Sequence, residues 1–313
     1  MSATKSDTKW ASTQHRLDRR GRAMGTSFHL IVVGGSSEVG DRMERQLHHL
    51  ESIWSRFVPS SEISELNAAP DNYQLVSEET AELIERGVQG WALTGGVFDP
   101  TILQAMMANG YDRTFSQCGN EEPAHRAGAS IGCGGIEVNR TINLVRLGPG
   151  VGFDPGGIGK GLAADLIVAD AMANGAAGAM ANIGGDLVCR GEAPTGQGWV
   201  IDVTERSVRD ERVALLTLEE GAVATSTTRK RRWRTADGER HHLLDPATGD
   251  SSSGPTMVTV IAAQGWYAEV VAKHLIVSGD PTVIDTDLAA AIVIEQGDPT
   301  GHTTIGEMGG YLR

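Results

Sequence analysis

Residues 154–165 read DPGGIGKGLAAD, and this stretch decides how the middle of the chain folds. A Pro-Gly-Gly turn precedes an apolar run in which Leu162 and Leu166 recur at helical spacing, which predicts a helix over residues 160–172. The first turn of a helix leaves backbone N–H groups unpaired and so favours an anion, and Lys160 adds a positive charge. The stretch therefore predicts a site for a phosphate or diphosphate at the start of this helix.

Two common nucleotide motifs do not fit this stretch. A P-loop needs a glycine five residues before Gly159, where Asp154 stands, and Ser or Thr after Lys160, where Gly161 stands. The dinucleotide fingerprint of a nicotinamide oxidoreductase is also missing, because no G-x-G-x-x-G follows a clear early strand with an acidic residue at the required distance. The remaining alternative is a plain turn with a solvated Lys160.

Composition excludes several classes of protein. The chain has 313 residues, of which 40% are hydrophobic, enough to bury a core. The 27 Lys and Arg against 40 Asp and Glu give a net charge of −13, which argues against a protein that coats nucleic acid or anionic lipid.

The cysteines Cys118, Cys133 and Cys189 lack C-x-x-C spacing and predict free thiols. Residues 1–20 contain no apolar run, so we expect a loose N-terminal segment and a cytoplasmic protein.

Hydrophobic periodicity predicts an α+β fold. Helices are expected over residues 36–57, 77–95, 160–172 and 267–277, and SRFVPSSEISELNA, residues 55–68, is expected to be a loop. A hairpin is expected over residues 136–147, and strands over residues 28–33, 177–183, 199–203, 213–218, 222–226, 257–262 and 288–295. Strands occur in runs rather than in strict alternation with helices, which favours α+β over a doubly wound parallel sheet.

Three further motifs are candidate sites, and each has a structural alternative. Asp99 in GVFDPT is expected to cap a helix that Pro100 begins. Asn182 opens NIGGD at a strand end, which either admits a flat ligand or forms a turn. His242 in HHLLDPATG, three residues before Asp245, is a candidate general base, because the pKa of a free imidazole lies near neutrality. The alternative is that the two histidines cap a hairpin.

The order of these motifs resembles one family. The chain carries MGTSF at Met24, SRFVPSSEISELNA at Ser55, GVFDPT at Gly96, DPGGIGKGLAAD at Asp154, NIGGDL at Asn182, VATS at Val223 and HHLLDPATG at His241. Over nearly all of residues 22–295 it is similar to the bacterial FAD:protein FMN transferases, the ApbE family. The resemblance implies a single domain over residues 21–313, with mixed and antiparallel sheets and packed helices in two interlocked lobes.

The resemblance also implies an activity. FAD is bound, and its FMN half is transferred through a phosphoester to a Thr or Ser hydroxyl of a target flavoprotein, while AMP leaves and Mg²⁺ assists. His242 matches the histidine that helps to deprotonate the acceptor hydroxyl, with Asp245 beside it. The residues implied to contact FAD are Met24, Phe57, Val97, Phe98, Asp99, Asp154 and Lys160.

The implied metal site departs from the family pattern. Family members commonly use a backbone carbonyl in the glycine-rich turn, here Gly157, with an Asp and a Thr four residues apart on a late helix. In this chain those two positions are Glu269 and Lys273. A glutamate offers Mg²⁺ a hard oxygen, but an ammonium cannot be a ligand. We hypothesise that the Glu269–Lys273 ion pair replaces the metal. The alternative function is an FAD-binding relative that has lost metal-dependent transfer.

A second departure follows VATS. The family usually continues with a glycine and an aromatic residue, whereas residues 227–233 here read TTRKRRW. The four consecutive basic residues are expected either to meet an acidic target or the FAD phosphates, or to keep an edge strand soluble.

Overall fold

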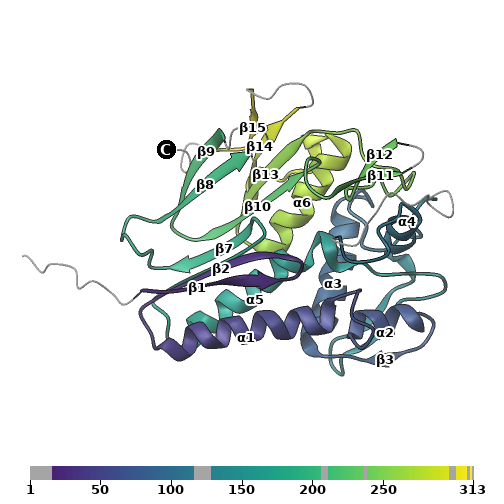
Figure 1. Ribbon diagram of the computed structural model, residues 1–313, viewed down its shortest axis with the longest axis horizontal. Helices are drawn as coiled ribbons and strands as arrows, with labels where there is room; N and C mark the ends of the chain where they lie inside the picture. The colour runs from purple at the N-terminus through teal and green to yellow at the C-terminus, as the bar shows by residue number, and fades with distance from the viewer. Residues whose placement is uncertain are drawn as a thin grey trace, which may run out of the picture.

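A central antiparallel sheet of eight strands organises the computed structural model, which describes residues 16–115, 128–205, 211–235, 238–295, 301–308 and 311 (Figure 1). Each strand of this sheet pairs antiparallel with its neighbours. The order across the sheet is β1 (Arg16–Ala23), β2 (Thr26–Val33), β6 (Gly178–Ile183), β7 (Asp186–Gly191), β10 (Gly221–Thr227), β13 (Met257–Ala262), β14 (Ala289–Ile294) and β15 (Thr303–Ile305). The predicted α+β fold is confirmed.

Both faces of this sheet are covered. Three helices pack on one face: α1 (Ser37–Trp54), α5 (Gly159–Ala173) and α6 (Gly265–Ser278) (Figure 1). The hairpin of β8 (Trp199–Glu205) and β9 (Glu211–Leu218) packs on the other face through a second hydrophobic cluster. Every residue of β13 and β14 is therefore buried, which explains why these strands are continuous apolar runs rather than alternating ones.

The remaining elements, apart from the hairpin of residues 232–241, include α2 (Glu62–Ala68) and β3 (Gln74–Leu75) at the lower right of Figure 1 and α4 (Leu103–Ala108) above them. The others are α3 (Glu78–Leu93), β4 (Glu137–Asn139) and β5 (Leu144–Arg146), with short 3₁₀ turns η2 (Cys133–Gly135), η3 (Pro155–Gly157) and η4 (Pro281–Val283). Ile84, Val145 and Phe153 belong to the same hydrophobic cluster as the sheet-facing residues of α5. The hydrophobic core is thus continuous from the sheet and its three helices into these remaining elements.

Two expectations about loops are wrong. Residues 16–20 are not loose, because β1 pairs with β2 along its whole length. This strand lies at the edge of the sheet, where charged residues are favoured, so it has no apolar run to reveal it. Within residues 55–68, α2 is capped by Ser61, whose hydroxyl accepts from the Ser64 N–H, and it is too short to show periodicity.

The expected helix start at Pro100 is also wrong. The helix that follows, α4, begins at Leu103. Asp99 instead closes a local turn, since its Oδ1 accepts from the backbone N–H of Thr101 at 2.8 Å and from its hydroxyl at 2.7 Å. The predicted hairpin over residues 136–147 is confirmed by β4 and β5.

Two of the three cysteines lie within the described residues. Cys133 and Cys189 are buried free thiols, while Cys118 lies outside the described residues. Among the helices that the structure describes, none has the length and apolar character needed to cross a bilayer.

Candidate active site

A cavity of about 670 Å³ brings the separate motifs together. Its size is typical of a pocket for a small molecule or cofactor. All seven residues implied to contact FAD line it: Met24, Phe57, Val97, Phe98, Asp99, Asp154 and Lys160. Gly157, His242 and Lys273 line it as well, whereas Asp245 and Glu269 are not among the described residues of its wall.

The DPGGIGKGLAAD stretch builds one side of this cavity. Asp154 caps η3 through the N–H of Gly156 at 2.8 Å. Gly161 lets α5 and α6 cross closely, because a Cβ there would lie 2.3 Å from the Gly265 carbonyl oxygen. Asp165 then accepts from the backbone N–H groups of Gly265 and Trp266 at 2.8 and 2.9 Å and so holds the start of α6. The stretch therefore fixes α6 against α5.

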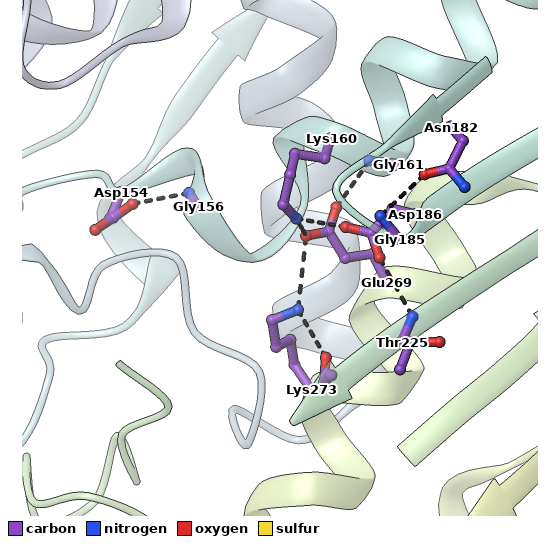
Figure 2. A network of polar contacts seen from close by, with 11 residues as sticks. Asp154, Gly156, Lys160, Gly161, Asn182, Gly185, Asp186, Thr225, Glu269 and Lys273 are labelled. Atoms are coloured by element: carbon purple, nitrogen blue, oxygen red, sulfur yellow. Dashed lines mark hydrogen bonds and ion pairs between the residues drawn. The ribbon is translucent and has the colours of Figure 1, made fainter. Parts of the chain in front are cut away.

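This crossing creates a buried ionic cluster of Lys160, Asp186, Glu269 and Lys273 (Figure 2). The Lys160 ammonium pairs with Asp186 and lies 2.5 Å from Glu269 Oε1. Lys273, one turn along α6, places its Nζ 3.6 Å from the same Glu269 oxygen. Glu269 has no exposed surface and Asp186 almost none. Two buried carboxylates thus balance two ammonium groups.

The two lysines of the ionic cluster differ in their electrostatics. Burial acts to lower the pKa of Lys160, but the adjacent Asp186 and Glu269 outweigh it and raise that pKa above its usual value. Burial lowers the pKa of Lys273, and the Glu269 carboxylate only partly opposes this effect. Lys160 is therefore held as a cation by its two partners, whereas Lys273 has a weaker hold on its proton.

The ionic cluster does not fit a divalent metal. Each carboxylate oxygen already accepts a donor: Lys160 occupies one oxygen of each acid, and the N–H groups of Thr225 and Gly161 occupy the others. The stem of Lys273 runs along the glycine turn, since a Cβ on Gly157 would lie 3.8 Å from Lys273 Cγ. A divalent ion would add two positive charges beside two ammonium groups. The structure therefore does not support Gly157 and Glu269 as metal ligands.

In the part of the chain that the structure describes, no group of three or more His, Cys, Asp or Glu side chains is placed to hold a metal ion.

Another part of the cavity is an aromatic wall, formed by Phe57, Tyr111 and Phe115 and backed by Trp233. The ring centroid of Tyr111 lies 5.9 Å from that of Phe57 and 5.6 Å from that of Trp233. The guanidinium of Arg56 stacks on Phe57 at 4.2 Å and on Tyr111 at 4.8 Å. This wall offers apolar rings, tilted against one another, next to a fixed cation.

Arg56 also explains the role of Asp154. Its Nε lies 3.0 Å from Asp154 Oδ2, and both side chains are almost completely buried, with 7% and 9% exposed. Asp154 is therefore neutralised by the protein itself and shapes the glycine turn. Asp99 is likewise occupied, since Ser130 donates to its second oxygen and ties a further loop to the cavity wall.

The two adjacent histidines have different environments. His241 ends the hairpin of β11 (Arg232–Thr235) and β12 (Gly238–His241). Its Nδ1 accepts from the Leu243 N–H, which makes Nε2 the protonated nitrogen that donates to the Ser252 carbonyl at 3.1 Å. The alternative of a hairpin cap thus applies to His241. Asp245 belongs to the following turn, where its Oδ1 accepts from the Ala247 N–H at 2.9 Å.

His242 faces the cavity. Its Nδ1 is buried and makes no hydrogen bond with the residues that the structure describes. Burial lowers the pKa of this imidazole well below its usual value, and the nearby cations Arg231, Lys273 and Lys160 lower it further. A neutral imidazole at the cavity wall can accept a proton, which is what a general base requires.

A family model matches most of this chain. The model of the ApbE family matches residues 24–290. The chain belongs to the ApbE family.

Curated proteins with similar sequences agree with this family assignment. The FAD:protein FMN transferase of Chlamydia pneumoniae is 26% identical over 266 residues, covering 80% of this chain and 81% of that protein. The FAD:protein FMN transferase of Klebsiella pneumoniae is 25% identical and covers 92% and 86%.

Solved structures agree on the fold. The ApbE protein of Thermotoga maritima superposes with a TM-score of 0.79 at 24% identity, covering 92% of this chain and 96% of that one. The flavin transferase ApbE of Vibrio cholerae gives a TM-score of 0.75 at 20% identity and covers 95% and 98%.

For several residues in or behind the cavity wall of this ApbE family member, the sequence indicated no specific role. Arg56 lies inside a recognised motif but carried no role, and Tyr111 stands outside every motif. Arg231 belonged to the basic run, but only its backbone and its place in the cavity distinguish it from its neighbours. Asp186 closed the NIGGD motif, and its partner Lys160 is separated from it by 26 residues.

Proposed function

We propose that this chain is an FAD:protein FMN transferase. The observation that carries the proposal is the convergence of seven implied FAD contacts, His242 and two largely buried lysines on one cavity. These residues come from segments spread over 250 positions of the sequence, from Met24 to Lys273, so their meeting depends on the fold. The names of the curated relatives support the same activity.

The cavity suits the parts of FAD. The glycine turn at η3, with Lys160 and Lys273 beside it, supplies N–H groups and positive charge for the diphosphate. The aromatic wall of Phe57, Tyr111 and Phe115 supplies a stacking surface for a flat ring. FAD acts here as the substrate.

His242 is the base in the proposed reaction. A Thr or Ser hydroxyl of the target flavoprotein attacks the phosphorus on the FMN side of the diphosphate, and its proton passes to the neutral imidazole. The new bond joins the acceptor oxygen to that phosphorus, and the bond from the phosphorus to the bridging oxygen of AMP breaks. The dianionic diphosphate becomes a monoanionic diester and an AMP dianion, and the released proton balances the charge.

Asp245 has a positioning role in this proposal. Its backbone oxygen accepts from the Gly249 N–H at 2.7 Å and its carboxylate holds the Ala247 N–H, which fixes the turn after His242. Contact with the acceptor hydroxyl is not required of it.

A direct assay tests the activity. The protein is incubated with FAD and a flavoprotein fragment that carries a Thr acceptor, and the products are analysed by intact-mass spectrometry and chromatography. We expect one FMN per fragment and an equal amount of AMP, and no FMN on a fragment whose acceptor Thr is replaced by Val. Intact FAD recovered from the protein without AMP would instead identify an FAD-binding relative that has lost transfer.

A further inference from the structure

Arg231 has a backbone conformation that an arginine rarely adopts. Its φ is +49°, in the left-handed region where a bulky side chain is strained. Of the three described non-glycine residues with such an angle, Met24 and Arg231 line the cavity and only Asn143 lies elsewhere. Such strain is concentrated at functional sites in proteins.

The Arg231 side chain reaches the turn between β1 and β2 at the cavity wall. A Cβ on Gly25, in the turn between β1 and β2, would lie 3.9 Å from Arg231 Nη2, so the guanidinium lies over that turn. Arg231, Lys160 and Lys273 line the same cavity as His242, and all three cations lower the pKa of this imidazole. The Arg231 guanidinium makes no hydrogen bond or ion pair with any residue that the structure describes.

Lys273 is a second cation at the cavity wall. Its Nζ donates to the Ser226 hydroxyl at 2.9 Å and approaches Glu269 from the cavity side. Lys160 is closer to the two carboxylates, since it pairs with Asp186 and lies 2.5 Å from Glu269. Lys160 therefore neutralises the buried acids most directly, which leaves Lys273 and Arg231 to face a ligand.

We propose that Lys273 and Arg231 bind the diphosphate of FAD and replace the divalent metal, so that this chain transfers FMN without a metal ion. The inference rests on the proposed function. A diphosphate carries two negative charges; Arg231 adds one positive charge that no described carboxylate balances, and Lys273 adds an ammonium that lies 3.6 Å from Glu269, an acid it shares with Lys160. A guanidinium can donate two parallel hydrogen bonds to a phosphate, while an ammonium acts as a point charge. Fixed cations also stabilise the charge that develops on the departing AMP.

Arg231→Gly is the sharpest variant, because glycine adopts the left-handed backbone without strain. We expect the affinity for FAD to fall about tenfold, as for loss of a charge-assisted hydrogen bond, without a lower melting temperature. The affinity for riboflavin, which lacks phosphate, should not change. Arg232→Ala is the matched control, since Arg232 is exposed, pairs with Glu239 across the hairpin and belongs to the same basic run.

Metal dependence is measured separately from transfer. Protein treated with EDTA is titrated with Mn²⁺ under electron paramagnetic resonance, and its affinity for FAD is measured by flavin fluorescence in EDTA and in Mg²⁺. We expect no saturable Mn²⁺ site and the same FAD affinity in both buffers. Lys273→Thr should bind FAD about tenfold more weakly in EDTA while its affinity for riboflavin is retained. A saturable Mn²⁺ site in the natural protein, or FAD binding that requires Mg²⁺, would overturn the proposal.

The transfer assay in EDTA separates this inference from the proposed function. FMN attached to the acceptor at equal rates in EDTA and in Mg²⁺ supports both. FMN attached only in Mg²⁺ contradicts the metal-free cation pair and leaves the transferase function standing. No attachment in either buffer, with FAD affinity still dependent on Arg231, contradicts the transferase function while the diphosphate site stands.

Discussion

The aromatic wall and the ionic cluster face the same cavity, but they are built in different ways. Each member of the ionic cluster lies in, or next to, a glycine-rich motif or a close helix crossing. The aromatic wall collects Phe57, Tyr111 and Trp233 from three distant segments that share no spacing. Buried charges need many specific partners, whereas apolar rings need only shape. Lys160 could therefore be identified from its motif, whereas Tyr111, which lies outside every motif, could not.

The ionic cluster and the aromatic wall also differ in the task proposed for each. In the proposed reaction, the ionic cluster and Arg231 bind the diphosphate and His242 moves a proton. The aromatic wall is placed to bind a ring. Substitutions on the two sides should therefore change different measurements.

The largest effect is expected from His242→Asn. Loss of the base should lower the rate of FMN transfer by about 10² to 10⁴, with FAD affinity nearly unchanged. Initial rates from the mass-spectrometric assay and FAD titrations measure the two quantities. His241→Asn is the matched control: its ring bonds to Ser252 and Leu243 are structural, so stability should fall while the folded protein keeps its rate. Equal losses of rate in the two variants would refute the assignment of the base.

The next largest effect is expected on stability, from a change at Arg56, which stacks on the aromatic wall. Arg56→Met leaves the buried Asp154 carboxylate without its partner, which should lower the free energy of unfolding by about 3–5 kcal/mol. Urea denaturation measures the loss. Adding Asp154→Asn to the same chain should restore part of it, because the uncompensated charge is then removed. A loss near zero in the single variant would show that the pair is not buried as the structure has it.

A smaller effect is a pH dependence of stability. The pKa of His242 is lower in the folded protein than in the unfolded chain, so below about pH 6.5 the unfolded state binds more protons. Stability should be complete above that pH and should fall as the pH drops toward the folded pKa, by at most about 1.4 kcal/mol per pH unit for this group. His241 and His274 shift in the same direction, so the difference between the natural protein and His242→Asn isolates the effect. Parallel unfolding curves for the two proteins from pH 5 to 7.5 would argue against a neutral buried His242.

The smallest effect is expected from Tyr111→Leu. Loss of the ring stacking should weaken FAD binding by about 0.5–1.5 kcal/mol. Calorimetric titrations with riboflavin and with AMP show which ring of FAD the wall contacts, since one of the two fragments should weaken by the same factor. Unchanged affinities for FAD and for both fragments would remove the aromatic wall from the binding site.

Much of the fold could be predicted from the sequence, for physical reasons. Helices α1, α3, α5 and α6 are long and either periodic or apolar, and their bounds agree with the predictions to within a few residues. The edge strand β1 and the short helix α2 were missed, because charges mask the first and the second spans only seven residues. Local patterns are informative where an element is long and buried, and much less so at edges.

The residues of the site could likewise be predicted only in part from local patterns. Motifs identified most of the cavity residues, but they did not show that Lys160 is buried between Asp186 and Glu269. The left-handed backbone of Arg231 and the stacking of Arg56 on Tyr111 also depend on tertiary contacts. Such pairings join residues far apart in the chain, and a single sequence carries no record of them.

A calorimetric titration of the purified protein with FAD tests the central claim most directly. The structure predicts saturable binding of one FAD per chain at this cavity, with riboflavin bound more weakly because it lacks the diphosphate. Absence of heat on mixing, with all of the flavin recovered in the filtrate after ultrafiltration, would contradict the assignment of the cavity.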